Sequence, residues 1–223
     1  MIKDMIKDLV ELPEGVWDEY ALQKEPLKGK ITKELKEKLL YNTHLCGKSL
    51  AEEVKSEYGN TIPSVLAEKL GLEVSYVQVE DDGATDGGNY NMFACYYEPN
   101  QVKIFNKTVK DATELIKNFE LDEILGEVQI LEILMAHEIY HYFEYTRKDL
   151  YTNQKLLTLW KLGKYKNVSK LVSLNEIGAM EFTKDLLGLP YSPYIFDVLL
   201  LYTMNKRLSY HLYESILQLN QIA

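Results

Sequence analysis

The sequence predicts a mostly helical α+β fold that contains one small antiparallel sheet of three strands. Apolar residues follow helical spacing before residue 72 and again after residue 106, whereas apolar and polar residues alternate in the stretch between them. The expected order is therefore helices, then a sheet, then helices. This order differs from the regular alternation of strands and helices that marks α/β proteins.

Residues 1–60 are expected to form a helical segment that packs on the rest of the protein. Short helices before residue 25 should be separated near Pro13, because proline interrupts the helical hydrogen-bond pattern. A charged helix is predicted from Thr32 to Tyr58, and Gly47 could interrupt it.

A short helix at residues 64–70 should lead into the sheet. Strands are predicted at residues 72–79, 91–97 and 102–106, and the segment 81–88 has the composition of a loop. We expect an antiparallel meander, because the connections are too short for the crossovers that parallel strands require.

The chain after residue 106 should be mainly helical. Proline residues at 190 and 193 separate the last two helices, and a break is expected near Lys206. The predicted helices cover residues 109–119, 122–145, 153–162, 167–187 and 194–219.

The composition is that of an ordinary globular protein, with 46% hydrophobic and 26% charged residues. The net charge of −9 and the lack of a basic cluster interleaved with aromatic residues argue against direct nucleic-acid binding. The first eight residues carry charges throughout, unlike a signal peptide, and the apolar runs are too short to cross a bilayer. We therefore expect a cytoplasmic protein without a membrane partner. Cys46 and Cys95 are far apart, so neither a disulfide framework nor a cysteine-type zinc site is expected.

One motif indicates chemistry. The segment Ala136-His137-Glu138-Ile139-Tyr140-His141 has the pattern H-E-x-x-H and falls inside a predicted helix. Residues four apart lie on the same helix face, so both imidazoles could bind one zinc ion. Glu138 would lie beside the metal-bound water and act as general base.

A chance occurrence on a solvated helix is the alternative interpretation. Apolar residues flank the motif, however, which predicts a core helix in which charged groups need partners. Two of the four histidines in the chain also belong to this pattern. The other two, His44 and His211, have no such context and are expected to be surface or hydrogen-bonded structural residues.

The third ligand must come from another part of the chain. Glu176 and Glu181 are the candidates, and Glu176 is favoured because Gly178 and Ala179 would allow its helix to approach the metal helix closely. Glu144 could orient His141 from behind or could be solvated.

An oxyanion donor is not assigned by the sequence. Tyr140, Tyr142 and Tyr165 are conceivable donors among the 17 tyrosines.

These segments resemble the ImmA/IrrE family of metallopeptidases. The family combines an H-E-x-x-H helix with a later E-x-x-A-x-x-F-x-x-x-L-L segment near a proline, and here the second segment runs from Glu176 to Leu187, followed by Pro190. The similarity extends over residues 62–190. Met180 stands where the family usually has Asn or Asp, and Thr183 replaces a usual Ala.

The resemblance implies a zincin-like metallopeptidase core at residues 61–190, with His137, His141 and Glu176 as gluzincin-type zinc ligands and Glu138 as the catalytic base. Residues 191–223 would be a helical extension of the same structural unit. The implied reaction is hydrolysis of a protein or peptide, in the family often a regulatory protein, and Mn²⁺ could replace Zn²⁺. The alternative is a catalytically weak metal-binding regulatory or interaction protein that keeps the peptidase fold.

Overall fold

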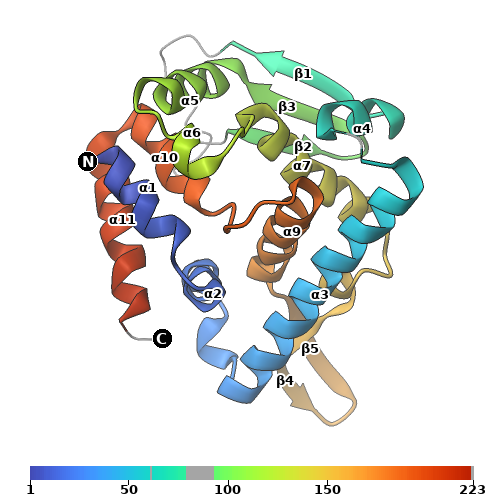
Figure 1. Ribbon diagram of the computed structural model, residues 1–223. Helices are drawn as coiled ribbons and strands as arrows, with labels where there is room; N and C mark the ends of the chain where they lie inside the picture. Colours follow the sequence, from blue (N-terminus) through green and yellow to red (C-terminus); the bar gives the residue numbers. More distant parts are fainter. Residues whose placement is uncertain (61, 79–92, 222–223) are drawn as a thin grey trace.

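The computed structural model describes residues 1–60, 62–78 and 93–221 (Figure 1). These residues form a mainly helical protein with a three-stranded sheet and a separate two-stranded hairpin, as expected for an α+β fold. The expected loop at residues 81–88 and the first part of the strand at 91–97 lie outside the described residues.

Along the chain, helices precede and follow the three-stranded sheet. The elements of the N-terminal half are α1 (Ile2–Val10), α2 (Glu14–Gln23), the 3-10 turn η1 (Lys28–Lys30), α3 (Lys33–Tyr58), α4 (Pro63–Lys69), β1 (Glu73–Val77), β2 (Ala94–Tyr97) and β3 (Gln101–Phe105). Those of the C-terminal half are α5 (Asn106–Asn118), α6 (Asp122–Leu125), α7 (Ile130–Thr146), α8 (Tyr151–Gln154), β4 (Leu156–Leu162), β5 (Tyr165–Lys170), α9 (Val172–Leu187), α10 (Ile195–Met204) and α11 (Lys206–Asn220).

The three-stranded sheet is mixed, so the predicted antiparallel meander is wrong. The strand order is β1-β3-β2, in which β3 pairs in parallel with β1 and antiparallel with β2. Only residues 98–100 connect β2 to β3, which forces those two strands to be antiparallel neighbours. The connection from β1 to β2 is long, so β2 need not lie beside β1, and β3 occupies the centre.

A β-hairpin replaces the predicted helix at residues 153–162. Leucine spacing in this stretch fits either structure, but Gly163 has φ +59°, which suits the first position of a two-residue hairpin loop. Strand β5 also takes up the beginning of the predicted helix at 167–187, so that α9 starts at Val172. The hairpin projects from the bottom of the molecule in Figure 1.

The helix expected at residues 122–145 is divided. Gly126 has φ +73°, a left-handed conformation that ends α6, and α7 begins only at Ile130. By contrast, α3 continues through Gly47, where an interruption was considered. The expected break near Lys206 is confirmed, because Asn205 caps α11 by accepting a hydrogen bond from the backbone N–H of Leu208.

Two glycines allow the helices α3, α7 and α9 to pack closely against one another. A Cβ atom at Gly47 of α3 would lie 2.6 Å from the carbonyl oxygen of Gly178 in α9. A Cβ atom at Gly178 would collide with the hydroxyl group of Tyr140, a fully buried residue of α7. The small residues therefore bring α9 against α7, as the sequence predicted for Gly178 and Ala179.

No helix within the described ranges combines the length and apolar character needed to cross a membrane. Cys46 and Cys95 are free thiols, and both are partly exposed rather than buried.

Candidate metal centre

The motif histidines lie on one face of α7, at the contact with α9. Helix α7 is buried on most of its surface and packs against α4, β2 and α9. Because His137 and His141 are one helical turn apart, their side chains converge, and their Nε2 atoms are 3.1 Å apart. The H-E-x-x-H motif therefore lies on a helix, as the sequence predicted.

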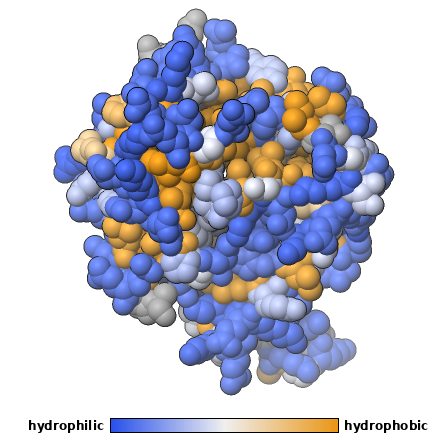
Figure 2. All heavy atoms as spheres, in the orientation of Figure 1, coloured by the Kyte–Doolittle hydropathy of each residue, from blue (hydrophilic) through white to orange (hydrophobic). Residues whose placement is uncertain are grey.

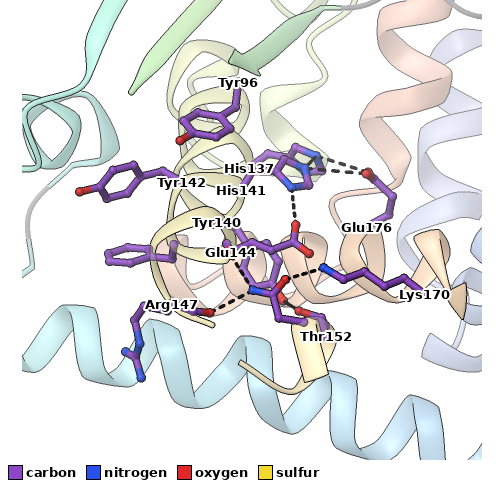
Figure 3. A network of polar contacts seen from close by, with 12 residues as sticks. Tyr96, His137, Tyr140, His141, Tyr142, Glu144, Arg147, Thr152, Lys170 and Glu176 are labelled. Atoms are coloured by element: carbon purple, nitrogen blue, oxygen red, sulfur yellow. Dashed lines mark hydrogen bonds and ion pairs between the residues drawn. The ribbon is translucent and has the colours of Figure 1, made fainter. Parts of the chain in front are cut away.

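Glu176 comes from the first turns of α9 and completes the group (Figure 3). Its carboxylate oxygens lie 3.5 Å from His137 Nε2 and 3.8 Å from His141 Nε2. Glu181 lies elsewhere, because its carboxylate is 2.9 Å from Nδ1 of His44. Of the two glutamates that the sequence left open, the structure therefore brings Glu176 to the histidines.

The three side chains fit a zinc ion in chemistry and in spacing. Two imidazoles and one carboxylate form a donor set found in catalytic zinc sites. Donor atoms at about 2.1 Å from a tetrahedral ion lie roughly 3.4 Å from one another, and the three potential ligand atoms lie within 4.8 Å of one another. The Glu176 side chain is 45% exposed, so the group is open on one side.

The side chains of this group attract one another by charge. Burial alone would raise the pKa of Glu176, but the hydrogen bond to His137 and the charges of His137 and His141 lower it to about 2. Burial would likewise lower the pKa of His137, whereas the hydrogen bond and charge of Glu176, with the charge of Glu138, raise it to about 9. A metal ion would have to displace the proton on His137, so metal binding should weaken as the pH falls.

Glu138 is buried beside this group. Burial raises its pKa above the usual range, against the lowering effect of His137, His141 and a backbone hydrogen bond from Tyr96 in β2. A carboxylate with a raised pKa is a better proton acceptor at neutral pH than an ordinary exposed glutamate. The sheet thus contributes to the site through the backbone of its edge strand β2.

A polar network behind His141 extends to the base of the hairpin (Figure 3). Nδ1 of His141 lies 3.3 Å from the Glu144 carboxylate. The backbone carbonyl of Glu144 accepts a hydrogen bond from the Asn153 side chain, whose oxygen accepts one from Lys170. This arrangement can fix the orientation of the His141 ring. The sequence indicated Glu144 but missed Asn153 and Lys170, because this segment was taken as helix.

The three tyrosines that the sequence suggested as oxyanion donors have other partners or lie elsewhere in the fold. The hydroxyl of Tyr140 is bonded to Thr152, at 3.1 Å, inside the core. The ring of Tyr142 packs edge-on against Tyr96. Tyr165 lies at the tip of the hairpin. Tyr140 is therefore unsuited to the role without rearrangement.

A second His-carboxylate group joins α2, α3 and α9. Nε2 of His44 lies 2.8 Å from Asp18, and Nδ1 lies 2.9 Å from Glu181. Glu14 is close to the same group but pairs with Lys184. Because both ring nitrogens of His44 donate to carboxylates, the group is a set of ion pairs around an imidazolium, in agreement with the expected structural role. His211 is exposed and lies near Glu214.

We expect the His44→Gln variant to lose about 3 kcal/mol of unfolding free energy near pH 6, because two partly buried carboxylates lose their cation. Burial would lower the pKa of His44, but bonds to Asp18 and Glu181 raise it from 6.5 to about 10. A raised folded-state pKa gives stability that is complete below about pH 6.5 and lost as the pH rises through about 10.

Urea unfolding of both proteins at several pH values would measure the difference between wild type and variant, which should shrink between pH ~6.5 and ~10. His211→Gln serves as the control, because this side chain is 59% exposed. A difference that does not depend on pH would contradict the imidazolium assignment.

The chain was compared with protein-family models, with curated proteins and with solved structures, and none of them matches it. The family resemblance of the two motif segments accordingly stays a prediction, and the functional argument depends on the geometry of the site.

Proposed function

We propose that this protein is a zinc-dependent metallopeptidase that hydrolyses peptide bonds of a protein or peptide, in line with the resemblance of its motifs to ImmA/IrrE metallopeptidases. The observation that carries the proposal is the convergence of His137, His141 and the Glu176 carboxylate beside the buried Glu138. His137, Glu138 and His141 come from the H-E-x-x-H helix α7, and Glu176 comes from the later helix α9.

Each side chain has a defined role in this proposal. His137, His141 and Glu176 hold the metal, and Glu144 orients the ring of His141. Bound zinc would supply Lewis acidity for the scissile carbonyl and lower the pKa of water. Glu138 accepts the proton of the attacking water and returns it to the leaving amine, which its raised pKa favours.

The position of the sheet favours an extended peptide as the substrate. Strand β2 is at the edge of the described sheet, and its backbone at Tyr96 donates a hydrogen bond to Glu138. Within the described residues no strand pairs with the outer edge of β2, and such an edge can pair with the backbone of an extended peptide. A substrate bound there would lie next to the proposed base.

The rival proposal is that the protein binds a metal and serves a regulatory role without appreciable hydrolysis. A purely structural metal site would not need Glu138, a buried carboxylate whose pKa is raised. This regulatory role would be favoured if the purified protein bound zinc but cleaved none of a broad set of peptide substrates.

Removal of the metal should abolish hydrolysis. We expect the purified protein to contain about one zinc ion per chain and to cleave members of a library of unstructured peptides. Dialysis against a chelator should remove both the zinc and the cleavage, and added Zn²⁺ should restore both. Elemental analysis and mass spectrometry of the products would measure the two effects. Cleavage that persists in the metal-free protein would exclude the proposed mechanism.

A further inference from the structure

The β4–β5 hairpin carries charge of one sign. Four lysines lie on it, and no aspartate or glutamate occurs between Asp149 and Glu176, in a chain with a net charge of −9. Figure 2 shows mainly hydrophilic residues on the visible face of the hairpin, at the bottom of the molecule. The lysines are Lys161, Lys164, Lys166 and Lys170. Such local concentration of positive charge favours an acidic partner.

The same hairpin exposes large apolar side chains. Leu162 is 74% exposed, and Trp160 and Tyr165 are also more than half exposed. Aromatic residues are enriched in binding interfaces, where they contribute much of the binding energy. Their presence on a projecting hairpin, and not in the core, is a feature that stability does not explain.

The pairing register separates these two kinds of side chain. Residues that are paired across two strands lie on the same face, and neighbours along a strand lie on opposite faces. Lys161 pairs with Lys166, whereas Leu162 pairs with Tyr165. Trp160 shares the face of Leu162, since it is two residues away on the same strand. One face of the hairpin tip is therefore basic and the other is apolar.

Both outer edges of the hairpin can accept another strand. Within the described part of the chain, β4 and β5 form a sheet only with each other. The outer edge of each strand thus presents unpaired backbone N–H and C=O groups, which form a template for strand addition.

We propose that the β4–β5 hairpin docks an extended acidic segment of a partner protein, in which acidic and apolar residues alternate. The segment adds as a third strand, so that its carboxylates face Lys161 and Lys166 and its apolar side chains lie against Trp160 and Leu162. A bilayer or a nucleic acid does not present acidic and apolar groups that alternate at the spacing of residues in a strand. An extended polypeptide can do so, and we therefore favour a polypeptide as the partner. The binding needs no metal and is independent of the proposed hydrolysis.

The test uses two decapeptides of the same composition, one with alternating Glu and Val and one with five Glu followed by five Val. Binding to the full-length protein is measured with chelator present, so that hydrolysis cannot alter the probes. Trp160 is 53% exposed, whereas Trp17 is 1% exposed, so a blue shift of tryptophan emission reports contact at the hairpin. Titration calorimetry gives the affinity.

The alternating peptide should bind about tenfold more tightly than the block peptide and shift the emission. The double variant K161E/K166E should weaken binding about tenfold or more. L162Q should weaken it several-fold, and its exposed position makes a folding defect implausible. The matched control K110E/K117E reverses two exposed charges on α5 and should leave binding unchanged.

Equal affinity for the two peptides, or equal loss in K161E/K166E and K110E/K117E, would overturn the proposal. So would the lack of peptide binding, whether or not the protein binds phosphatidylserine vesicles or a single-stranded oligonucleotide. Because these measurements are made without metal, their failure leaves the proposed peptidase function standing, and failure of hydrolysis leaves the docking result unaffected.

Discussion

Replacing Glu138 by glutamine should reduce peptide hydrolysis by roughly 10³-fold while the protein keeps its zinc. Glutamine has nearly the shape of glutamate but cannot accept a proton, and a positioned general base typically contributes factors of this size. The substitution also removes a buried carboxylate whose pKa burial has raised, so the fold should tolerate it. Cleavage rates on one peptide substrate and zinc content per chain are measured together.

Glu132→Gln is the matched control for this experiment. Glu132 is a buried carboxylate of the same helix, and it accepts hydrogen bonds from the backbone and the hydroxyl of Ser64. Its substitution should lower the unfolding free energy and leave the cleavage rate of the folded protein close to that of wild type. Unchanged cleavage in the Glu138 variant would show that another group is the base. Equal loss in both variants would point to a general defect in α7.

The parts of the site that depend on local spacing could be predicted from the sequence. The convergence of His137 and His141 follows from helical geometry alone, and the small residue Gly178 correctly indicated a close approach of two helices. The distinction between Glu176 and Glu181 needed the structure, because both lie on one helix and their partners lie on different elements. His44, which faces Glu181, is far away in sequence.

The errors in the predicted fold have a different physical cause. The leucines between residues 156 and 162 are compatible with a helix or a strand, and the hairpin forms because Gly163 can adopt a left-handed φ and β5 supplies backbone partners. The central place of β3 in the sheet likewise depends on pairing between segments distant in sequence. A period detected along the chain contains no information on which strands become neighbours.

Glu176→Gln should weaken zinc binding by at least about 100-fold, because even residues that only support a ligand contribute up to that factor. Its carboxylate lies within 3.8 Å of both histidine Nε2 atoms. The charges of the histidines and the hydrogen bond to His137 lower its pKa to about 2, so it is ionised at any pH at which His137 could release its proton. Glutamine keeps the size of the side chain and removes the charge that a divalent cation requires.

Glu181→Gln lies on the same helix and tests the alternative ligand. This variant should bind zinc as wild type does but should be less stable, because His44 loses one of its two carboxylates. Zinc should raise the melting temperature of wild type and of Glu181→Gln, and it should have little effect on Glu176→Gln, since a ligand stabilises only the protein that binds it. The opposite pattern, with zinc binding lost in Glu181→Gln alone, would move the metal to the His44 group and remove the geometric basis of the proposed peptidase site.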